Sequence, residues 1–323
     1  MKTIVASGFL LSILYFHSPV MPQKLVVGTY TTNGSKGIYI YDFDAGTGSA
    51  KKLSVAEAGN PSYLTISDDN QFIYSVNESD EGKISSFSYD KHTAALTLLN
   101  KQPNNGSAPC YVSLDKTGKW LFAGNYGSGN LTVHPIKKDG SIDEMQQLVQ
   151  HTGSSVNKDR QAAPHVHCTY VSPDNKYLYV PDLGIDKVMI YPFDANTGKL
   201  DEKNKSSIDV PAGGGPRHII FSKKGQFAYL IEEMTGNVNV IKRDGAKHSI
   251  IQTENHLPKG EAGAGADIHL SPDEQFLYVS QRSNSTLQIF KVNPKDGKIK
   301  YVGEQSTLGN FPRNFTIHPS GAY

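Results

Sequence analysis

The chain contains few of the residues that build disulfide scaffolds, metal centres or nucleic-acid-binding surfaces. Only two of its 323 residues are cysteines, Cys110 and Cys168, and no Cys-x-x-Cys motif occurs, which argues against a zinc ribbon or a disulfide-stapled fold. Its 32 Lys and Arg residues nearly balance 31 Asp and Glu residues. We therefore expect neither nucleic acid nor an anionic membrane surface as a general partner. Apolar residues at helical spacing are also scarce, which argues against an α-helical fold.

The motifs of several enzyme classes are missing as well. No Gly-x-Ser-x-Gly sequence is present, so a serine hydrolase of the nucleophile-elbow type has no support. The glycine-rich stretch at Gly213 does not lead into a helical pattern, unlike the phosphate-binding loop of nucleotide hydrolases. His165 and His167 could share one side of a strand, but no third ligand has suitable spacing. We expect neither a metal ion nor a cofactor.

One long apolar run stands at the N-terminus. Lys2 is followed by a mainly apolar run over residues 4–16 and then by a polar stretch that begins at His17. This arrangement predicts a signal peptide over residues 1–22, and the run is too short to predict a transmembrane helix. Residues 23–323 would then form the mature domain, periplasmic or secreted and without membrane contact after cleavage. A leader that does not function, and a cytoplasmic protein, are the alternative.

The chain does have an internal repeat. Six stretches align without internal gaps, and each joins a short apolar strand through a polar turn to a second strand that carries aromatic residues. Their first residues lie 47 to 57 positions apart, at Ser62, Cys110, His167, Arg217, Ala266 and Arg313. Two aromatic residues stand two positions apart in the second strand, for example Phe72 and Tyr74. Because side chains in a strand alternate between its faces, each stretch predicts a β-hairpin that buries two rings.

Each hairpin is followed by an alternating strand with a Gly-containing turn and by a less regular fourth strand. Four strands in a repeat of this length predict an all-β, seven-bladed β-propeller of four-stranded blades. One early unit near Gly37, five complete units and a start at Arg313 give the count of seven. The sequence ends at Tyr323, inside the last hairpin, so we expect residues 23–323 to hold a C-terminally incomplete propeller. A six-bladed ring closed by the N-terminal strands is the alternative.

Propeller geometry brings equivalent ends of successive hairpins to one mouth of the central channel. The first strands begin with the six residues given above, and the positions after them are Tyr63, Tyr111, Cys168, His218, Asp267 and Asn314. The second strands end at Asn77, Asn125, Asp182, Glu232 and Gln281, followed by Glu78, Tyr126, Leu183, Glu233 and Arg282. Unlike polar groups gathered in this way predict a site for a small anionic or polyhydroxylated ligand. In the alternative, these residues only form hydrogen bonds to backbone groups of nearby loops and bind no ligand.

Several segments resemble the 6-phosphogluconolactonase-like lactonase family, which also contains the fungal 3-carboxymuconate cyclase. They are G-P-R-H at Gly215, A-D-I-H-x-S-P-D at Ala266, and F-P-R-N-F-T-I-H-P-S-G at Phe311. The resemblance implies a seven-bladed propeller with a lactone site on one face. It also implies a catalytic set, which is His167, Arg217, Glu233 and Arg282. The rim positions add candidate substrate-binding residues, which are His218, Asp267, Arg313, Asn125 and Asn77.

The function that the resemblance implies is hydrolysis of a sugar lactone, with conversion of 6-phosphogluconolactone to 6-phosphogluconate as the first candidate. Arg217 and Arg282 would hold the anionic group and stabilise the oxyanion, and His167 or Glu233 would activate water. The residues leave open which of these two is the base. Two alternatives are a carboxymuconate-type lactonising cycloisomerase and a non-enzymatic propeller that binds a carbohydrate or peptide. The expected partner is a small anionic lactone, and the sequence does not indicate an oligomeric state.

Overall fold

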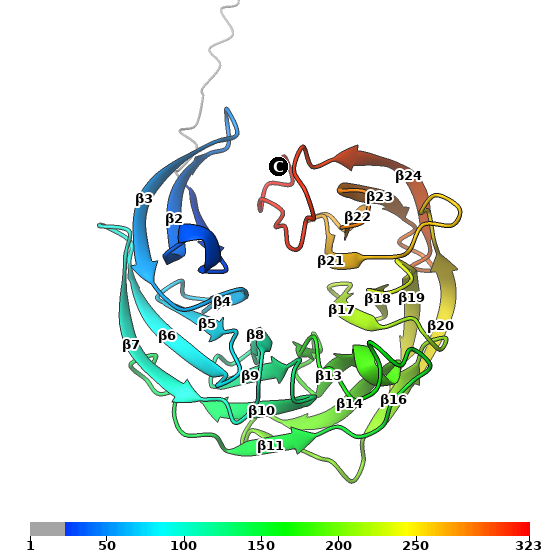
Figure 1. Ribbon diagram of the computed structural model, residues 1–323, viewed down its shortest axis with the longest axis horizontal. Coiled ribbons are helices and arrows are strands. Elements are labelled where there is room, and N and C mark those ends of the chain that lie inside the picture. The colour runs from blue at the N-terminus through cyan, green and yellow to red at the C-terminus, as the bar shows by residue number, and fades with distance from the viewer. Residues whose placement is uncertain (1–22) are drawn as a thin grey trace, which may run out of the picture.

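The computed structural model describes residues 23–323, so the predicted signal peptide over residues 1–22 lies outside the described residues. This part of the chain forms 24 strands and two short 3-10 turns, η1 (Thr32–Gly34) and η2 (Leu183–Ile185). The strands build six antiparallel sheets that stand around a common centre (Figure 1). The all-β propeller predicted from the repeat is therefore confirmed. None of the helical turns in the described residues is long and apolar enough to cross a membrane.

The sheets follow one another along the chain. The first three contain β1 (Gln23–Gly28), β2 (Gly37–Asp44) and β3 (Ser49–Glu57); β4 (Leu64–Ile66), β5 (Phe72–Asn77), β6 (Lys83–Asp90) and β7 (Ala95–Pro103); and β8 (Pro109–Leu114), β9 (Trp120–Asn125), β10 (Asn130–Pro135) and β11 (Gln147–Gln150). The last three contain β12 (Tyr170–Val171), β13 (Tyr177–Asp182), β14 (Lys187–Asp194), β15 (Lys199–Leu200) and β16 (Ser206–Asp209); β17 (Pro216–Phe221), β18 (Phe227–Glu232), β19 (Val238–Asp244) and β20 (Lys247–Glu254); and β21 (Gly265–Leu270), β22 (Phe276–Gln281), β23 (Thr286–Val292) and β24 (Ile299–Ser306).

Within a complete sheet, the strands run outward from the centre in chain order. Strands β4, β8, β17 and β21 lie next to the centre, whereas β7, β11, β20 and β24 lie on the outside (Figure 1). Each pair is antiparallel, as in the hairpin of β17 and β18, which places Ile219 opposite Leu230. The first residues of the inner strands are thus held around one end of the ring.

The paired aromatic residues join neighbouring sheets. The second ring of each pair is buried at Tyr74, Phe122, Tyr179 and Tyr229, and the first ring is partly exposed. The hydroxyl of Tyr229 donates to the carbonyl of Gly297 in the next sheet at 3.0 Å, and the indole of Trp120 donates to Ala195 at 2.9 Å. Burial of such large rings between sheets stabilises the packing of each sheet against the next. Only Tyr278 departs from the pattern, because its ring stays partly exposed.

The described residues form six sheets, which match the six units of the repeat, whereas the start of a seventh, incomplete blade predicted at Arg313 forms no sheet. Residues 307–323 form no strand within the described chain, although a strand was expected from Arg313. They lie between the first and sixth sheets (Figure 1), where Asn314 bonds to Asp267 at 2.6 Å and the ring of Tyr323 lies 5.5 Å from that of Phe43. The backbone N–H of Phe315 bonds to the Asp267 side chain instead of to a neighbouring strand. A strand needs such a partner, which explains the difference.

The first sheet differs from the others because it has three strands. Among the described strands, β1 pairs only with β2. The alternative of a six-bladed ring closed by N-terminal strands is therefore wrong for residues 23–323. The segment of residues 307–323 lies between the two end sheets instead and contacts β2 through the rings of Tyr323 and Phe43.

Candidate active site

Residues at the ends of the second strands divide into two classes with different roles. The last residue of each strand is buried, and its side chain bonds to nearby loops or to the next strand: Asn77, Asn125, Asp182, Glu232 and Gln281. Glu232, for example, accepts hydrogen bonds from Asn237 at 2.8 Å and from Asn239 at 2.5 Å. Because strand side chains alternate, the residue after each of these points to the other side. Four of these next residues are Glu78, Tyr126, Glu233 and Arg282.

Two of the predicted substrate-binding residues, Asn77 and Asn125, belong to this first, buried class. The amide of Asn77 donates to Gly59 at 2.9 Å and accepts from Ser85 at 2.5 Å. The amide of Asn125 accepts from Asn104 at 2.5 Å and donates to Asn130 at 2.7 Å. Both side chains are buried, and the protein itself takes up their hydrogen-bonding capacity. The structure therefore does not bring Asn77 and Asn125 into contact with the other predicted site residues.

The four residues of the implied catalytic set do come together, and the carboxylate of Glu233 is their common neighbour. Its Oε2 lies 3.0 Å from Nε of Arg217, 3.0 Å from Nη2 of Arg282 and 3.9 Å from Nε2 of His167. Its Oε1 accepts a hydrogen bond from Arg160 at 2.7 Å. Burial raises the pKa of Glu233, but the charges of Arg217, Arg282 and Arg160 outweigh burial and lower it to about 2. Glu233 is therefore an anion at neutral pH.

Arg217, at the start of β17, is the largest fully buried side chain of the described residues. Its Nε donates to Glu233, and its Nη1 donates to the carbonyl of Ala266 at 2.5 Å and to Nε2 of His218 at 3.2 Å. Arg282 donates from Nε to Ala264 at 3.0 Å. Within residues 23–323, no acceptor binds Nη2 of Arg217 or Nη1 of Arg282. These two nitrogens remain as donors for a ligand.

His167 is a neutral base beside this cluster. Its ring is buried, and its Nδ1 lies 3.7 Å from Sγ of Cys110. Burial lowers the pKa of His167 well below its usual range, and the positive charges of Arg217 and Arg313 lower it further. The imidazole is therefore unprotonated at neutral pH, and Nε2 is on the side of Glu233.

Asp267, His218 and Arg313 also lie in this region, and of the three only His218 bonds directly to the catalytic set. Asp267 Oδ1 accepts from Nδ1 of His218 at 2.8 Å, and Oδ2 lies 3.0 Å from Nε2 of His269. The guanidinium of Arg313 lies over the ring of Tyr30, 5.6 Å from its centre. The three predicted residues are thus near the catalytic set, and Asp267 and His218 are linked to it through Arg217.

Arg160 is the main residue that sequence reasoning missed. It lies in the loop between β11 and β12, and its Nη2 donates to the hydroxyl of Tyr126 at 3.1 Å as well as to Glu233. The only signal in the sequence was the spacing of 57 residues between the repeats at Cys110 and His167, the longest of the series. Extra residues in a repeat of fixed length form a loop, and such loops often carry function.

The carboxylate of Asp186 fixes this loop. It accepts hydrogen bonds from Gln161 at 2.7 Å and Ser155 at 2.5 Å in the loop. It also accepts from the backbone N–H groups of Gly213 at 2.7 Å and Gly215 at 2.8 Å. One buried carboxylate thus holds both the loop segment on either side of Arg160 and the glycine-rich stretch that leads into β17.

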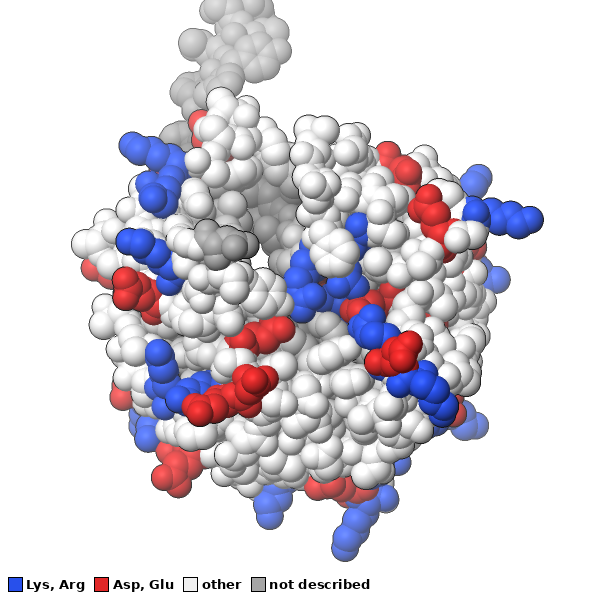
Figure 2. All heavy atoms as spheres, viewed as in Figure 1, with Lys and Arg blue, Asp and Glu red and all other residues white. Residues whose placement is uncertain are grey.

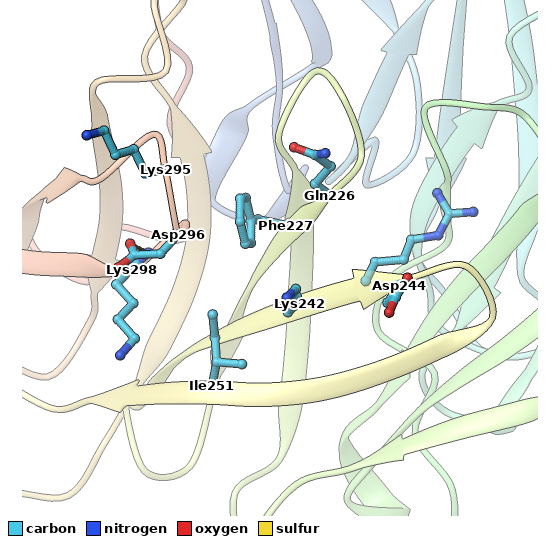
Figure 3. A pocket seen from close by; sticks show the side chains of 9 residues that line it. Gln226, Phe227, Lys242, Asp244, Ile251, Lys295, Asp296 and Lys298 are labelled. Atoms are coloured by element: carbon cyan, nitrogen blue, oxygen red, sulfur yellow. Dashed lines mark hydrogen bonds between the residues drawn. The ribbon is translucent and has the colours of Figure 1, made fainter.

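The two described cavities do not contain the catalytic set. One of about 690 Å³ lies between β19, β20 and the loop that follows β23, and Phe227, Lys242, Lys295 and Lys298 are among its lining residues (Figure 3). The other, of about 250 Å³, is lined by Tyr63, Tyr111 and Asp115. The candidate site is instead a buried polar cluster. Figure 2 shows basic and acidic side chains side by side near the centre of one face.

Comparison with known proteins gives one consistent result. A family model described as a lactonase with a 7-bladed β-propeller matches residues 24–323. The 6-phosphogluconolactonase of Bacillus subtilis is 34% identical over 306 residues, which are 92% of this chain and 85% of the relative. A periplasmic gluconolactonase of Pseudomonas aeruginosa, of known structure, is 36% identical with a TM-score of 0.87. That match covers 92% of this chain and 86% of the other. A Formosa agariphila 6-phosphogluconolactonase is 34% identical over 93% of this chain and 87% of its own length.

Proposed function

The chain belongs to the seven-bladed β-propeller lactonase family, and on that premise we propose that it hydrolyses a sugar lactone at the cluster around Glu233. The first candidate substrate is 6-phosphogluconolactone, because relatives that are 34% identical carry the name 6-phosphogluconolactonase. The observation that carries the proposal is the convergence of Arg217, Arg282 and Arg160 on one buried carboxylate beside a neutral histidine. Such a cluster supplies both a base and cationic donors.

The arginines suit an anionic substrate and an anionic transition state. Four arginines, Arg160, Arg217, Arg282 and Arg313, stand against three carboxylates, Glu78, Glu233 and Asp267. The positive excess favours a phosphate or carboxylate on the ligand. The donors Nη2 of Arg217 and Nη1 of Arg282 would stabilise the oxyanion that forms when water attacks the lactone carbonyl.

His167 is the better candidate for the general base. Glu233 has a pKa of about 2 and is engaged by three arginines, so it is a weak proton acceptor. His167 is neutral, and Nε2 makes no hydrogen bond within residues 23–323. It would take a proton from water as the C–O bond forms. The protonated imidazole would then return that proton to the ring oxygen as the ester C–O bond breaks.

Glu233 would assist in two ways without transferring a proton itself. Its charge would stabilise the imidazolium of His167 during the reaction, since Oε2 lies 3.9 Å from Nε2. Its ion pairs would also keep Arg217 and Arg282 in one orientation. Both effects prepare the electrostatic environment before the substrate binds, which is how charged sites usually accelerate reactions.

The proposal also covers where in the cell the protein is located. A relative from Pseudomonas aeruginosa is named a periplasmic gluconolactonase, and the apolar run over residues 4–16 has the pattern of a signal peptide. We infer that residues 1–22 direct export and are removed. Expression of the full chain, followed by cell fractionation and mass determination of the product, tests this. Cytoplasmic protein with the leader still attached contradicts it.

The decisive experiment on function is a hydrolysis panel with the full chain. It compares 6-phosphogluconolactone, gluconolactone and a carboxylated muconolactone under conditions that limit spontaneous hydrolysis. Faster hydrolysis of a sugar lactone, abolished in Arg217→Ala, supports the proposal. Turnover of the muconolactone alone would favour a cycloisomerase. Tight binding of gluconate 6-phosphate with no turnover of any lactone would favour a binding propeller, and either result contradicts the proposal.

A further inference from the structure

One hydrogen-bonded chain links Arg217 to the carboxylate of Asp267 through the imidazole of His218. Nη1 of Arg217 lies 3.2 Å from Nε2 of His218, and Nδ1 of His218 lies 2.8 Å from Oδ1 of Asp267. A guanidinium can only donate, so Nε2 must carry the lone pair. The proton of the neutral ring is then on Nδ1, where the carboxylate accepts it. A single tautomer satisfies both neighbours.

We propose that His218 is a positioning residue that orients the Arg217 guanidinium by accepting its hydrogen bond, and that Asp267 fixes the tautomer that can accept it. The inference rests on the proposed function, in which Arg217 contacts the lactone. It assigns to His218 and Asp267 a role other than the substrate binding expected from their rim positions. His218 would act on the reaction only through Arg217.

Asp267 is well placed to impose a tautomer because its own position is fixed. The residue is buried, and its Oδ2 accepts from Nδ2 of Asn314 at 2.6 Å and from the backbone N–H of Phe315 at 3.2 Å. His269 Nε2 is 3.0 Å from the same oxygen. These contacts leave Oδ1 directed at His218, so the carboxylate cannot easily rotate away from the imidazole.

The environment of the ring keeps His218 neutral. The charged and titratable groups that face it are Arg217, Asp267 and His269, with the rings of His167, Tyr63 and Tyr111 at 5.3, 5.9 and 5.1 Å between centres. Burial and the charge of Arg217 lower the pKa of His218 to about 4, although Asp267 acts in the opposite direction. A protonated ring would place an N–H against a guanidinium N–H, so neutrality is required for the contact.

The consequence for Arg217 is that each of its bound nitrogens has a defined acceptor. Nε is directed at Glu233, and Nη1 at Ala266 and His218. Together they fix the plane of the guanidinium and therefore the direction of Nη2. Misplacement of a catalytic group by about 1 Å costs on the order of 100-fold in rate, so loss of one acceptor should reduce kcat more than it changes KM.

Two substitutions of His218 separate its two contacts. In His218→Gln, the side-chain oxygen can occupy the place of Nε2 and accept from Arg217, but no donor reaches Asp267. In His218→Asn, the side-chain amide can occupy the place of Nδ1 and donate to Asp267, but no acceptor reaches Arg217. We expect kcat to fall on the order of 100-fold in His218→Asn and about 10-fold or less in His218→Gln. Equal activities, or the reverse order, overturn the proposal.

Asp267→Asn tests the tautomer without relying on turnover. The amide oxygen is needed by Asn314 and Phe315, so the NH2 group faces His218 and donates to Nδ1. The ring proton then moves to Nε2 and opposes Arg217. In ¹⁵N-histidine NMR spectra of the full chain, we expect the Nδ1-protonated signals of His218 to give way to Nε2-protonated signals. An unchanged tautomer, or unchanged kcat with the tautomer reversed, overturns the proposal. If the wild-type protein hydrolyses no lactone, the proposed function is wrong, but the NMR spectra still show which tautomer His218 adopts.

Discussion

Nε of Arg217 donates to Oε2 of Glu233 at 3.0 Å, and the two side chains are 1% and 8% exposed. A buried ion pair of this kind contributes little net stability, because desolvation of both charges offsets their attraction. Removing one partner is costly, however, because it leaves the other charge buried and unpaired. The pair therefore makes Glu233 indispensable to a cluster that also contains Arg282 and Arg160.

Glu233→Gln should reduce both stability and activity. The substitution keeps the shape of the side chain but leaves three arginines without their common anion, so we expect a loss of about 3 kcal/mol in the free energy of unfolding. The activity should fall because the imidazolium of His167 and the orientation of Arg217 both depend on the carboxylate. Urea unfolding at pH 7 measures the first effect, and lactone hydrolysis measures the second.

The same variant gives a pH test with a defined sign. The folded-state pKa of Glu233 is lowered from 4.5 to about 2, so its stabilising effect is present above about pH 4.5 and lost as the pH falls toward 2. The difference in unfolding free energy between wild type and Glu233→Gln should therefore shrink over that range. A difference that stays constant from pH 6 to pH 3 would contradict the assigned ionisation.

His167 should set the acidic side of the activity profile. Burial and the nearby arginines lower its pKa well below 6.5, so the base form persists at pH 6 and below. We expect kcat/KM to stay level from pH 8 to below pH 6 and then to decline as His167 is protonated. His167→Gln should lose 10²- to 10⁴-fold in kcat, the usual contribution of a general base. A midpoint at or above pH 6.5, or an active His167→Gln, would exclude this role.

The fold was predictable because every repeat has the same order of apolar strand, polar turn and aromatic strand. The spacing of Phe72 and Tyr74 indicates a strand, and the polar turn before them indicates a hairpin. The local pattern in each repeat therefore predicts the same fold as the repeat as a whole. That residues 307–323 form no strand was not predictable, since a strand at Arg313 requires a neighbour to pair with, and the repeat pattern says nothing about whether one is present. In the described residues, the backbone at Phe315 bonds to the side chain of Asp267 instead.

The sequence predicted that His167, Arg217, Glu233 and Arg282 lie near one another, and the structure brings them together. It does not bring Asn77 and Asn125, which were predicted with them, into contact with this set. The alternation of side chains along a strand could have shown that Glu232 and Glu233 have different roles, because two consecutive strand residues point to opposite sides. The strand pattern could not show that Glu233 forms ion pairs with three arginines, since one of them, Arg160, lies in a loop of irregular length. Nor could it show that His218 lies between Arg217 and Asp267, because that contact joins neighbouring sheets.

Arg160→Ala should affect substrate binding more than folding. The side chain is 45% exposed, and Glu233 keeps Arg217 and Arg282 as partners, so its removal should lower stability by no more than about 1 kcal/mol. It also supplies a positive charge at the outer side of Glu233, and we expect KM for a phosphorylated lactone to rise about 10-fold, the effect of about 1.4 kcal/mol. Arg243→Ala is a matched control, because Arg243 binds Asp174 at the same distance of 2.7 Å, outside the site. An equal rise in KM for both variants would contradict the prediction.

Asp186→Asn should loosen two loops at once. Asp186 has a φ of 54°, a left-handed conformation that Asn tolerates, so the backbone at this position should be retained. An amide has one oxygen, however, and cannot accept from Ser155, Gln161, Gly213 and Gly215 together. At least one of the N–H groups of Gly213 and Gly215 therefore loses its acceptor, and the loss costs about 1–3 kcal/mol where the group is buried.

This loosening should reach the active site because the two loops lead to Arg160 and Arg217. We expect faster amide hydrogen exchange at Gly213 and Gly215, together with a fall in kcat, while the amides of distant sheets keep their protection. Asp139→Asn is the control, because Asp139 lies in an exposed turn and bonds only to Ser141. Since Asp186 contacts neither arginine directly, loss of activity with unchanged exchange at the two glycines would show that its hydrogen bonds do not transmit the effect.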